Sequence, residues 1–172
     1  ARRDPAFQDN VAALEAVQPK DLEASEIEVR IGATWIDKSY YQQFTYETFN
    51  TLASLRRSVQ VQYSLHTAEW FITGKRDVPY NDVAAYTTYG TKRASAYDIL
   101  EDSLNLRDVR IYDTVTDPDG KERRVLNAKE TTLAAQKQQA VRDAFQTWIW
   151  KDPERRQALV NVYNEKMNNI RP

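Results

Sequence analysis

The residues of this chain best suited to a chemical role are three pairs of adjacent cations. Each pair lies at the boundary of a predicted element; the pairs are Arg56 and Arg57, Lys75 and Arg76, and Lys92 and Arg93. The segment from Thr51 to Tyr97 holds six basic and three acidic residues, a local charge of +3. The same segment carries several aromatic residues: Tyr63, Trp70, Tyr80, Tyr86 and Tyr89. Cations bind phosphates and aromatic rings stack on bases, so this mixture predicts contact with nucleic acid. The alternative is that charges at the ends of elements only keep those ends solvated.

Nucleic-acid binding by all three pairs requires the chain to gather them on one side. Their placement at element boundaries permits this arrangement but does not require it. If six phosphates were contacted, the log-log dependence of affinity on salt would have a slope of about −5, at about 0.9 per contact on duplex DNA.

The sequence offers few residues for catalysis, metal binding or a phosphate-binding loop. The chain has no cysteine, one histidine and four glycines, and Gly32, Gly74, Gly90 and Gly120 are too far apart for a phosphate-binding loop. His66 follows Ser64 in a predicted hairpin tip, where a solvated loop histidine is the favoured interpretation. We therefore expect no catalytic residue, no metal site and no cofactor in this chain.

A calcium loop is excluded by position. With Gly120 as the sixth residue of such a loop, its first and twelfth ligands would be Val115 and Leu126, which have no oxygen side chains. The stretch around Asp119-Gly120 instead predicts a tight hairpin turn.

The elements that must position the basic pairs are mostly helices. Apolar residues at helical spacing predict helices over 11–17, after Asp37, before Gly90, over 92–106 and over 128–170. Residues 58–73 and 108–126 alternate as strands and predict two hairpins. The fold class expected is α+β, mainly helical with two small antiparallel β-hairpins and a C-terminal helical hairpin over 128–170, broken at Asp152-Pro153. Length predicts a single domain over residues 1–172.

Two tryptophans of the long helix have different predicted roles. Trp148 lies on the apolar stripe with Val141 and Phe145 and is expected in the core. Trp150 points away from that stripe, so it is our candidate for an interaction surface.

Composition sets the expected environment. The 24 Lys and Arg residues nearly balance 25 Asp and Glu, which gives no global attraction to nucleic acid or to a membrane. No apolar run is long enough to span a bilayer, and the absence of cysteine fits a reducing, cytoplasmic location. The start of the sequence, Ala-Arg-Arg-Asp-Pro without an initiator Met, leads us to expect a piece of a longer protein.

Three long stretches carry a resemblance to a known class of protein. They run over Asn10–Asp37, Pro79–Thr114 and Lys129–Glu165, and so cover nearly the whole chain. They resemble one region of the very large bacterial helicase–DNA methylase proteins of phages, plasmids and conjugative elements. In those proteins an adenine-specific DNA methylase module comes first and a Swi/Snf-type helicase module follows, and this chain resembles the region between them, ending just ahead of the helicase motor.

The resemblance implies a role without catalysis for these residues. The methylase Pro-Pro motif, the Gly-Lys-Thr loop of the motor and its acidic metal-binding box are all missing here. ATP, Mg²⁺ and S-adenosylmethionine would belong to the parent protein. The expected function is a connector domain that contacts DNA and positions the flanking methylase and helicase modules. The alternative is a protein-interaction scaffold with no DNA contact, which would rely on Trp150 and the final helices.

Overall fold

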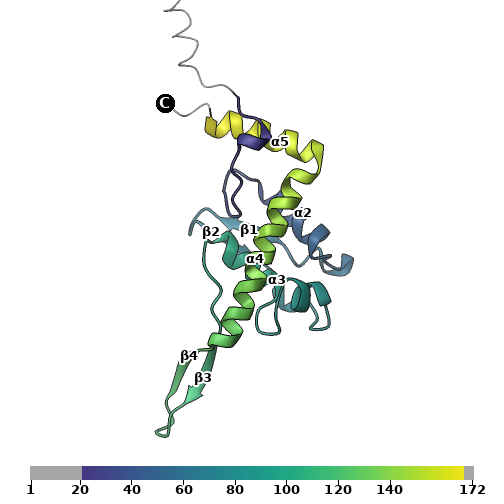
Figure 1. Ribbon diagram of the computed structural model, residues 1–172. Coiled ribbons are helices and arrows are strands. Elements are labelled where there is room, and N and C mark those ends of the chain that lie inside the picture. Colours follow the sequence, from purple (N-terminus) through teal and green to yellow (C-terminus); the bar gives the residue numbers. More distant parts are fainter. Residues whose placement is uncertain (1–20, 169–172) are drawn as a thin grey trace, which may run out of the picture. The chain divides into compact units, whose positions relative to one another are not determined.

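The computed structural model describes residues 21–168 and confirms the α+β class (Figure 1). The chain is mainly helical and contains two separate two-stranded antiparallel sheets, as predicted. It divides into two compact units, one formed by residues 29–151 and the other, among the described residues, by 21–28 and 152–168. The helix expected over 11–17 lies outside the described residues. The single domain expected over 1–172 stays a prediction.

Helix α2 (Lys38–Thr48) brings the first aromatic side chains into the core of the larger unit. It begins where predicted, because the Asp37 carboxylate accepts a hydrogen bond from the backbone N–H of Ser39 at 3.0 Å. Tyr41 and Phe44 are fully buried, and their rings lie 5.2 Å from that of Phe145. Leu52 continues the helical spacing of Tyr41 and Phe44 in the sequence, but it is 47% exposed because the helix ends at Thr48.

The first hairpin pairs β1 (Val61–Ser64) with β2 (Glu69–Ile72). Its register places Val61 opposite Ile72, and both are buried. Trp70 packs against Tyr41 with ring centroids 4.9 Å apart, so this tryptophan belongs to the core.

The second hairpin pairs β3 (Tyr112–Thr116) with β4 (Glu122–Leu126), from Tyr112 opposite Leu126 to Thr116 opposite Glu122. Gly120 has a φ of 87° in the connecting turn, as the sequence predicted. The hairpin extends away from the other elements of its unit, and most of its side chains are exposed (Figure 1). Its first strand begins at Tyr112 rather than at Asp108.

Three short elements lie between the hairpins: η3 (Lys75–Asp77), η4 (Ala84–Thr88) and α3 (Ala96–Leu104). Asp82 accepts a hydrogen bond from the backbone N–H of Ala85 at 3.0 Å, at the start of η4. Helix α3 begins later than predicted, because Ser95 and Asp98 form a capping box that fixes its first turn. The residues before Ser95 are thereby released to form a loop that carries Lys92 and Arg93.

Helix α4 (Ala128–Lys151) is the longest helix among the described residues. Asn127 caps it by accepting a hydrogen bond from the N–H of Glu130 at 3.0 Å. Val141, Phe145 and Trp148 are buried as predicted, whereas Leu133 is 41% exposed. Gln138 takes an unexpected place in the core: its amide donates to Ser103 Oγ and to the Arg107 carbonyl and accepts from the N–H of Val109.

The C-terminal part is helical, as expected, with α5 (Pro153–Tyr163) and η5 (Asn164–Asn168) following α4. Asp152 caps α5 and Pro153 occupies its first turn. Leu159 and Tyr163 are buried, whereas Met167 is 43% exposed. The Asn164 side chain holds the segment before η1 (Ala24–Glu26) through two hydrogen bonds with the backbone of Leu22. No helix in residues 21–168 has the length and apolar character needed to cross a membrane.

Candidate nucleic-acid interface

Two of the three basic pairs line one surface hollow. Lys75 and Arg76 of η3 and Lys92 and Arg93 of the loop before α3 share a hollow of about 250 Å³ with two tyrosines. Its remaining lining comes from Ser95 and Asp98, the capping box of α3. The chain thus brings together four cations that are separated in sequence into two pairs. We call this site the basic hollow.

Lys75 is the most strongly held of the four cations. Its ammonium lies 2.9 Å from Glu101 Oε1 and 3.2 Å from Asp98 Oδ1. Burial alone would lower the pKa of Lys75, but the hydrogen bonds and charges of Glu101 and Asp98 outweigh it and raise that pKa. Lys75 is therefore a charged, fixed part of the wall.

Arg93 is held by residues that lie outside the lining of the hollow. Its guanidinium donates to Asp113 Oδ1 at 2.8 Å and to the backbone carbonyl of Tyr112 at 2.9 Å. The hydrogen bond from Arg93, with a second from Asn127, holds the pKa of Asp113 below its usual value. The loop that carries Lys92 and Arg93 is thereby joined to the start of β3.

Arg76 and Lys92 differ from these two cations. Both are exposed, and among residues 21–168 neither forms a hydrogen bond or an ion pair. An incoming anion would meet these two cations without first displacing a carboxylate. The charge available to a ligand is therefore smaller than the four cations suggest.

Tyr80 and Tyr86 form the aromatic part of the basic hollow. Their ring centroids are 5.0 Å apart and the rings are tilted by 37°. Tyr80 is 80% exposed, whereas Tyr86 is partly buried and its hydroxyl donates to the carbonyl of Val78 at 3.4 Å. Burial raises the pKa of the Tyr86 hydroxyl, and nearby Tyr80, Asp98 and Asp82 add to the rise.

The loop before α3, which carries Lys92 and Arg93, is held in shape by hydrogen bonds within it and by the close packing of Gly90. The N–H of Thr91 donates to the carbonyl of Ala94 at 2.7 Å, and Thr91 Oγ1 accepts from the N–H groups of Arg93 and Ala94. Gly90 lies so close to the backbone of Ala85, Ala94 and Ala96 that a Cβ there would overlap it. Backbone packing thus fixes the position of Lys92 and Arg93.

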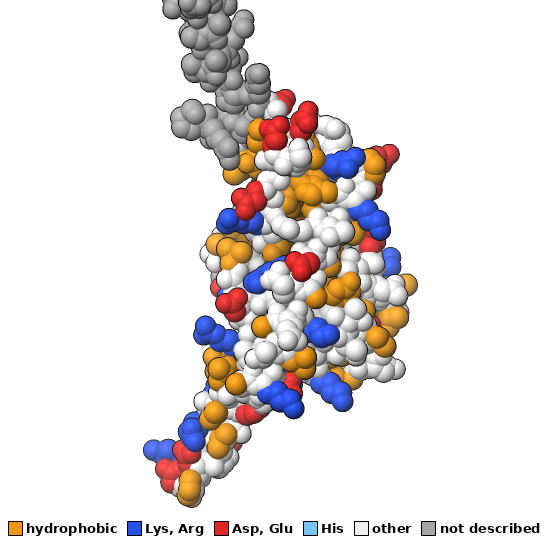
Figure 2. All heavy atoms as spheres, in the orientation of Figure 1, with side chains coloured by type: hydrophobic (Ala, Val, Ile, Leu, Met, Phe, Trp, Pro, Cys, Tyr) orange, Lys and Arg blue, Asp and Glu red, His pale blue; other side chains and the backbone are white. Residues whose placement is uncertain are grey.

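The remaining basic pair, Arg56 and Arg57, lies elsewhere. Arg56 and Arg57 are exposed residues after η2 (Ala53–Leu55) and are not part of the basic hollow. The Arg56 guanidinium lies over the ring of Tyr46, 4.6 Å from its centroid, and its Nε donates to the carbonyl of Thr51. On the face drawn in Figure 2, Lys and Arg side chains are scattered among acidic ones. The structure therefore brings together four of the six predicted cations.

The other candidate residues from the sequence lie outside the basic hollow. His66 is exposed in the loop between β1 and β2, where Ser64 Oγ accepts a hydrogen bond from the N–H of Thr67. Trp150 is partly buried near the C-terminal end of α4. Within residues 21–168, no three His, Asp or Glu side chains are grouped as a metal site would need.

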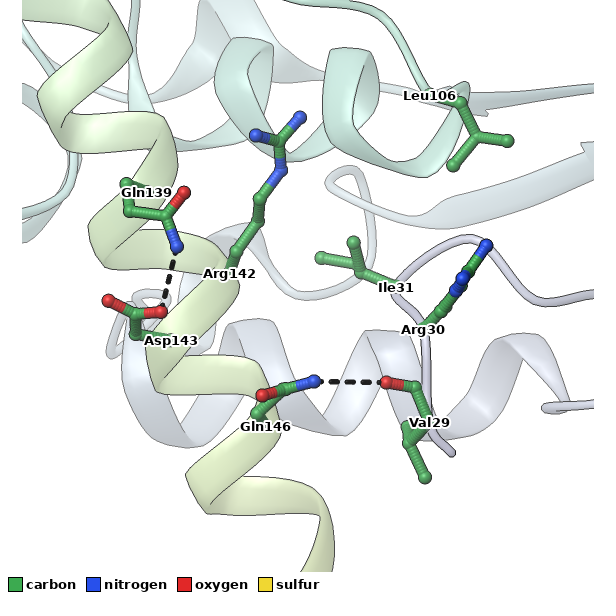
Figure 3. Close-up of a pocket in the computed structure, with 8 residues that line it drawn as sticks. All are labelled: Val29, Arg30, Ile31, Leu106, Gln139, Arg142, Asp143 and Gln146. Atoms are coloured by element: carbon green, nitrogen blue, oxygen red, sulfur yellow. Dashed lines mark hydrogen bonds between the residues drawn. The ribbon is translucent and has the colours of Figure 1, made fainter. Parts of the chain in front are cut away.

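A second hollow of about 370 Å³ lies between α4 and the segment Val29–Ile31 (Figure 3). Gln139, Arg142, Asp143 and Gln146 line it from the helix, and Gln146 donates to the carbonyl of Val29 at 3.2 Å. Leu106 forms its far end and is 76% exposed. Leu106 also has a φ of 59°, a left-handed conformation that costs a leucine about 1 to 2 kcal/mol. We call this site the Leu106 hollow.

Sequence reasoning missed the partners of the cations and the whole Leu106 hollow. Glu101 and Asp113 pair with Lys75 and Arg93 only because the chain folds back over 26 and 20 residues. The left-handed residue after a helix is usually glycine, so a leucine there gave no signal. The capping box at Ser95 and Asp98 could have been found, since it follows the Ser-x-x-acid pattern.

Comparison with known proteins gives a family without a function. Residues 30–169 match the model of a family described as a domain of unknown function, DUF8437. No curated protein and no solved structure matches the chain.

Proposed function

Since this chain belongs to the DUF8437 family, whose function is not established, we propose from its geometry that it is a DNA-contacting connector domain. The observation that carries the proposal is the basic hollow, where Lys75, Arg76, Lys92 and Arg93 lie around two tyrosines. Cations beside exposed aromatic rings suit phosphates and bases. The resemblance to helicase–DNA methylase proteins supplies the setting: the domain would hold DNA and position the flanking methylase and helicase modules in the cytoplasm.

The proposed contact is weak and depends strongly on salt. Of the four cations of the basic hollow, Arg76 and Lys92 are the two that form no ion pair or hydrogen bond with the described residues, so they would supply most of its phosphate contacts. On duplex DNA, two phosphates contacted give a log-log salt slope of about −2, and four phosphates give about −4. The slope of about −5 expected for six contacts would need Arg56 and Arg57, which lie outside the basic hollow.

Fluorescence anisotropy with labelled DNA at a series of salt concentrations tests this proposal. Reversing the charges of Arg76 and Lys92 to Glu should abolish most binding at low salt and flatten the slope. Arg56→Glu with Arg57→Glu is the matched control, because it makes the same change of net charge away from the basic hollow. Absence of binding at low salt, or equal effects of the two double variants, would contradict the proposal.

The proposed domain works without catalysis or a cofactor of its own. The missing nucleotide and methylase motifs support this part of the proposal, and ATP, Mg²⁺ and S-adenosylmethionine would act in the parent protein's other modules. Turnover assays should detect neither ATP hydrolysis nor methyl transfer by the purified chain. Activity that disappears on substitution of a residue within the chain would make it an enzyme.

The Leu106 hollow favours a second function, a protein-interaction scaffold. Leu106 is exposed and strained, so its side chain contributes little to the stability of the fold. Such a residue is expected where a partner protein covers it. Leu106→Gly should raise the free energy of unfolding, because glycine relieves the left-handed strain, yet weaken binding to a flanking module. Calorimetric titration of each module with both forms of the chain measures the binding. Unchanged affinity in the variant would remove this alternative.

A further inference from the structure

Building on the proposed function, we propose that the basic hollow accepts an unpaired DNA nucleotide rather than a stretch of duplex. Its phosphate would bind between Arg76 and Lys92, and its base would stack on the ring of Tyr80. The observations that carry this inference are the uneven pairing of the four cations, the exposure of Tyr80 and the concave shape of the site.

The pairing of the cations limits how many phosphates the site can take. Lys75 is held by two carboxylates and Arg93 by one, at 2.8 to 3.2 Å. A phosphate that used these cations would compete with Asp98, Glu101 and Asp113 for them. Arg76 and Lys92 carry no such competitor among the described residues. Two cations across one hollow suit a single phosphate, whereas a duplex groove is followed by a longer row of cations.

Tyr80 offers a second feature for binding, an exposed aromatic ring. At 80% exposure the side chain contributes little to the core, so packing does not account for an aromatic residue at this position. Tyr86 lies 5.0 Å away and, being partly buried and hydrogen-bonded to Val78, gives the Tyr80 ring a fixed neighbour. A ring held in this way is a stacking surface for another flat group.

Only an unpaired base can use such a surface. In a duplex the faces of the bases are covered by their stacked neighbours, and a protein reaches only their edges through the grooves. In a single strand each base exposes a face that stacks on aromatic side chains whatever its sequence. A hollow of about 250 Å³, lined by residues of η3 and of the loop before α3, admits one such group.

The test compares labelled single-stranded DNA of about 12 nucleotides with its duplex, both against residues 1–172 at low salt. Single-stranded DNA should bind more tightly. Tyr80→Ala should weaken that binding about 5- to 100-fold, the range for loss of one base–aromatic stack, and leave duplex binding unchanged. Tyr80→Phe keeps the ring and should restore the affinity. Phe71→Ala is the control, since Phe71 is an exposed aromatic residue of β2 outside the basic hollow.

The outcomes separate this inference from the function on which it rests. Equal affinity for both DNA forms, or single-strand binding that Tyr80→Ala leaves unchanged, overturns the inference while DNA contact by Arg76 and Lys92 stands. Absence of binding to either DNA overturns both. A single-stranded RNA of the same sequence forms the last arm: equal binding supports recognition of an unpaired nucleotide, and binding of RNA alone overturns the assignment to DNA.

Discussion

The guanidinium of Arg93 and the carboxylate of Asp113 lie 2.8 Å apart and join the basic hollow to the foot of the β3–β4 hairpin. The same guanidinium donates to the backbone carbonyl of Tyr112, so it is held at two points. Arg93 is thus held in place by its own partners. Of this pair of cations, Lys92 is the one that can bind a ligand without first breaking an ion pair.

The pairing of Arg93 with Asp113 should be visible in the titration of the carboxyl group. The hydrogen bond from Arg93 lowers the folded-state pKa of Asp113 below its ordinary value of 3.8. The stabilisation is therefore complete only above about pH 5, where the carboxyl is ionised in both the folded and the unfolded chain, and it is lost as the pH falls through the lowered pKa. Carboxyl-detected NMR should place the Asp113 midpoint below 3.8 in the native chain, and Arg93→Gln should raise it. Arg123→Gln is the control, because Arg123 pairs with Asp117 and should leave Asp113 unchanged.

Trp148 should be one of the costliest side chains to truncate. It is 7% exposed, packs on Phe44 and Phe145, and its indole N–H donates to Glu47 at 3.3 Å. Trp148→Ala should lower the free energy of unfolding by about 3 to 5 kcal/mol through the cavity that it leaves. Chemical denaturation measures the change. Trp150→Ala, at a partly buried site on the same helix, should cost less, and equal losses would contradict the assignment of Trp148 to the core.

Gln138 should behave as a structural polar residue of the core. Gln138→Leu keeps the side-chain size but leaves the N–H of Val109 and the carbonyl of Arg107 without their partner. The loss should be at least about 2 kcal/mol, since each buried group left without a hydrogen bond costs about 1 to 3 kcal/mol. Gln136→Leu is the matched control on an exposed position of α4, expected to change stability by less than about 0.5 kcal/mol. A tolerated Gln138→Leu would mean that other groups take over these bonds.

Gly90 should be needed for the shape of the basic hollow. A Cβ at this position would overlap the carbonyl of Ala85 and crowd the backbone of Ala96. Gly90→Ala should therefore cost about 1 to 3 kcal/mol and weaken DNA binding by displacing Lys92 and Arg93. Gly120→Ala separates the two causes: its φ is 87°, but nothing lies within 4 Å of an added Cβ. It should cost only the left-handed strain, about 1 to 2 kcal/mol, and leave binding unchanged.

Local signals in the sequence were sufficient for most of the elements. Caps such as Asp37, Asn127 and Asp152 act on N–H groups two or three residues away, so the sequence contains both partners within one turn. Periodicity was less reliable at the ends of helices. Leu133 and Leu52 fit the helical spacing of their neighbours, yet both are exposed, and Leu52 lies beyond the end of α2 at Thr48.

The candidate site was predictable only in part, for a reason of distance along the chain. Lys75, Arg76, Lys92 and Arg93 could be recognised as pairs, but their common location depends on how the loop closes at Gly90. Their pairing with carboxylates depends on contacts across 20 and 26 residues, which no local pattern encodes. Arg56 and Arg57 show the converse, since the same pattern occurs there without a shared hollow.

The basic hollow is lined by one uninterrupted stretch of chain, from Lys75 to Asp98. The entropy lost in closing a loop grows with the logarithm of its length, so bringing these walls together costs the unfolded chain comparatively little. Contacts between residues close in sequence also form fast during folding. The walls of the hollow should therefore assemble early, before the chain that supplies α4 has packed, and the distant Asp113 should lock Arg93 only afterwards.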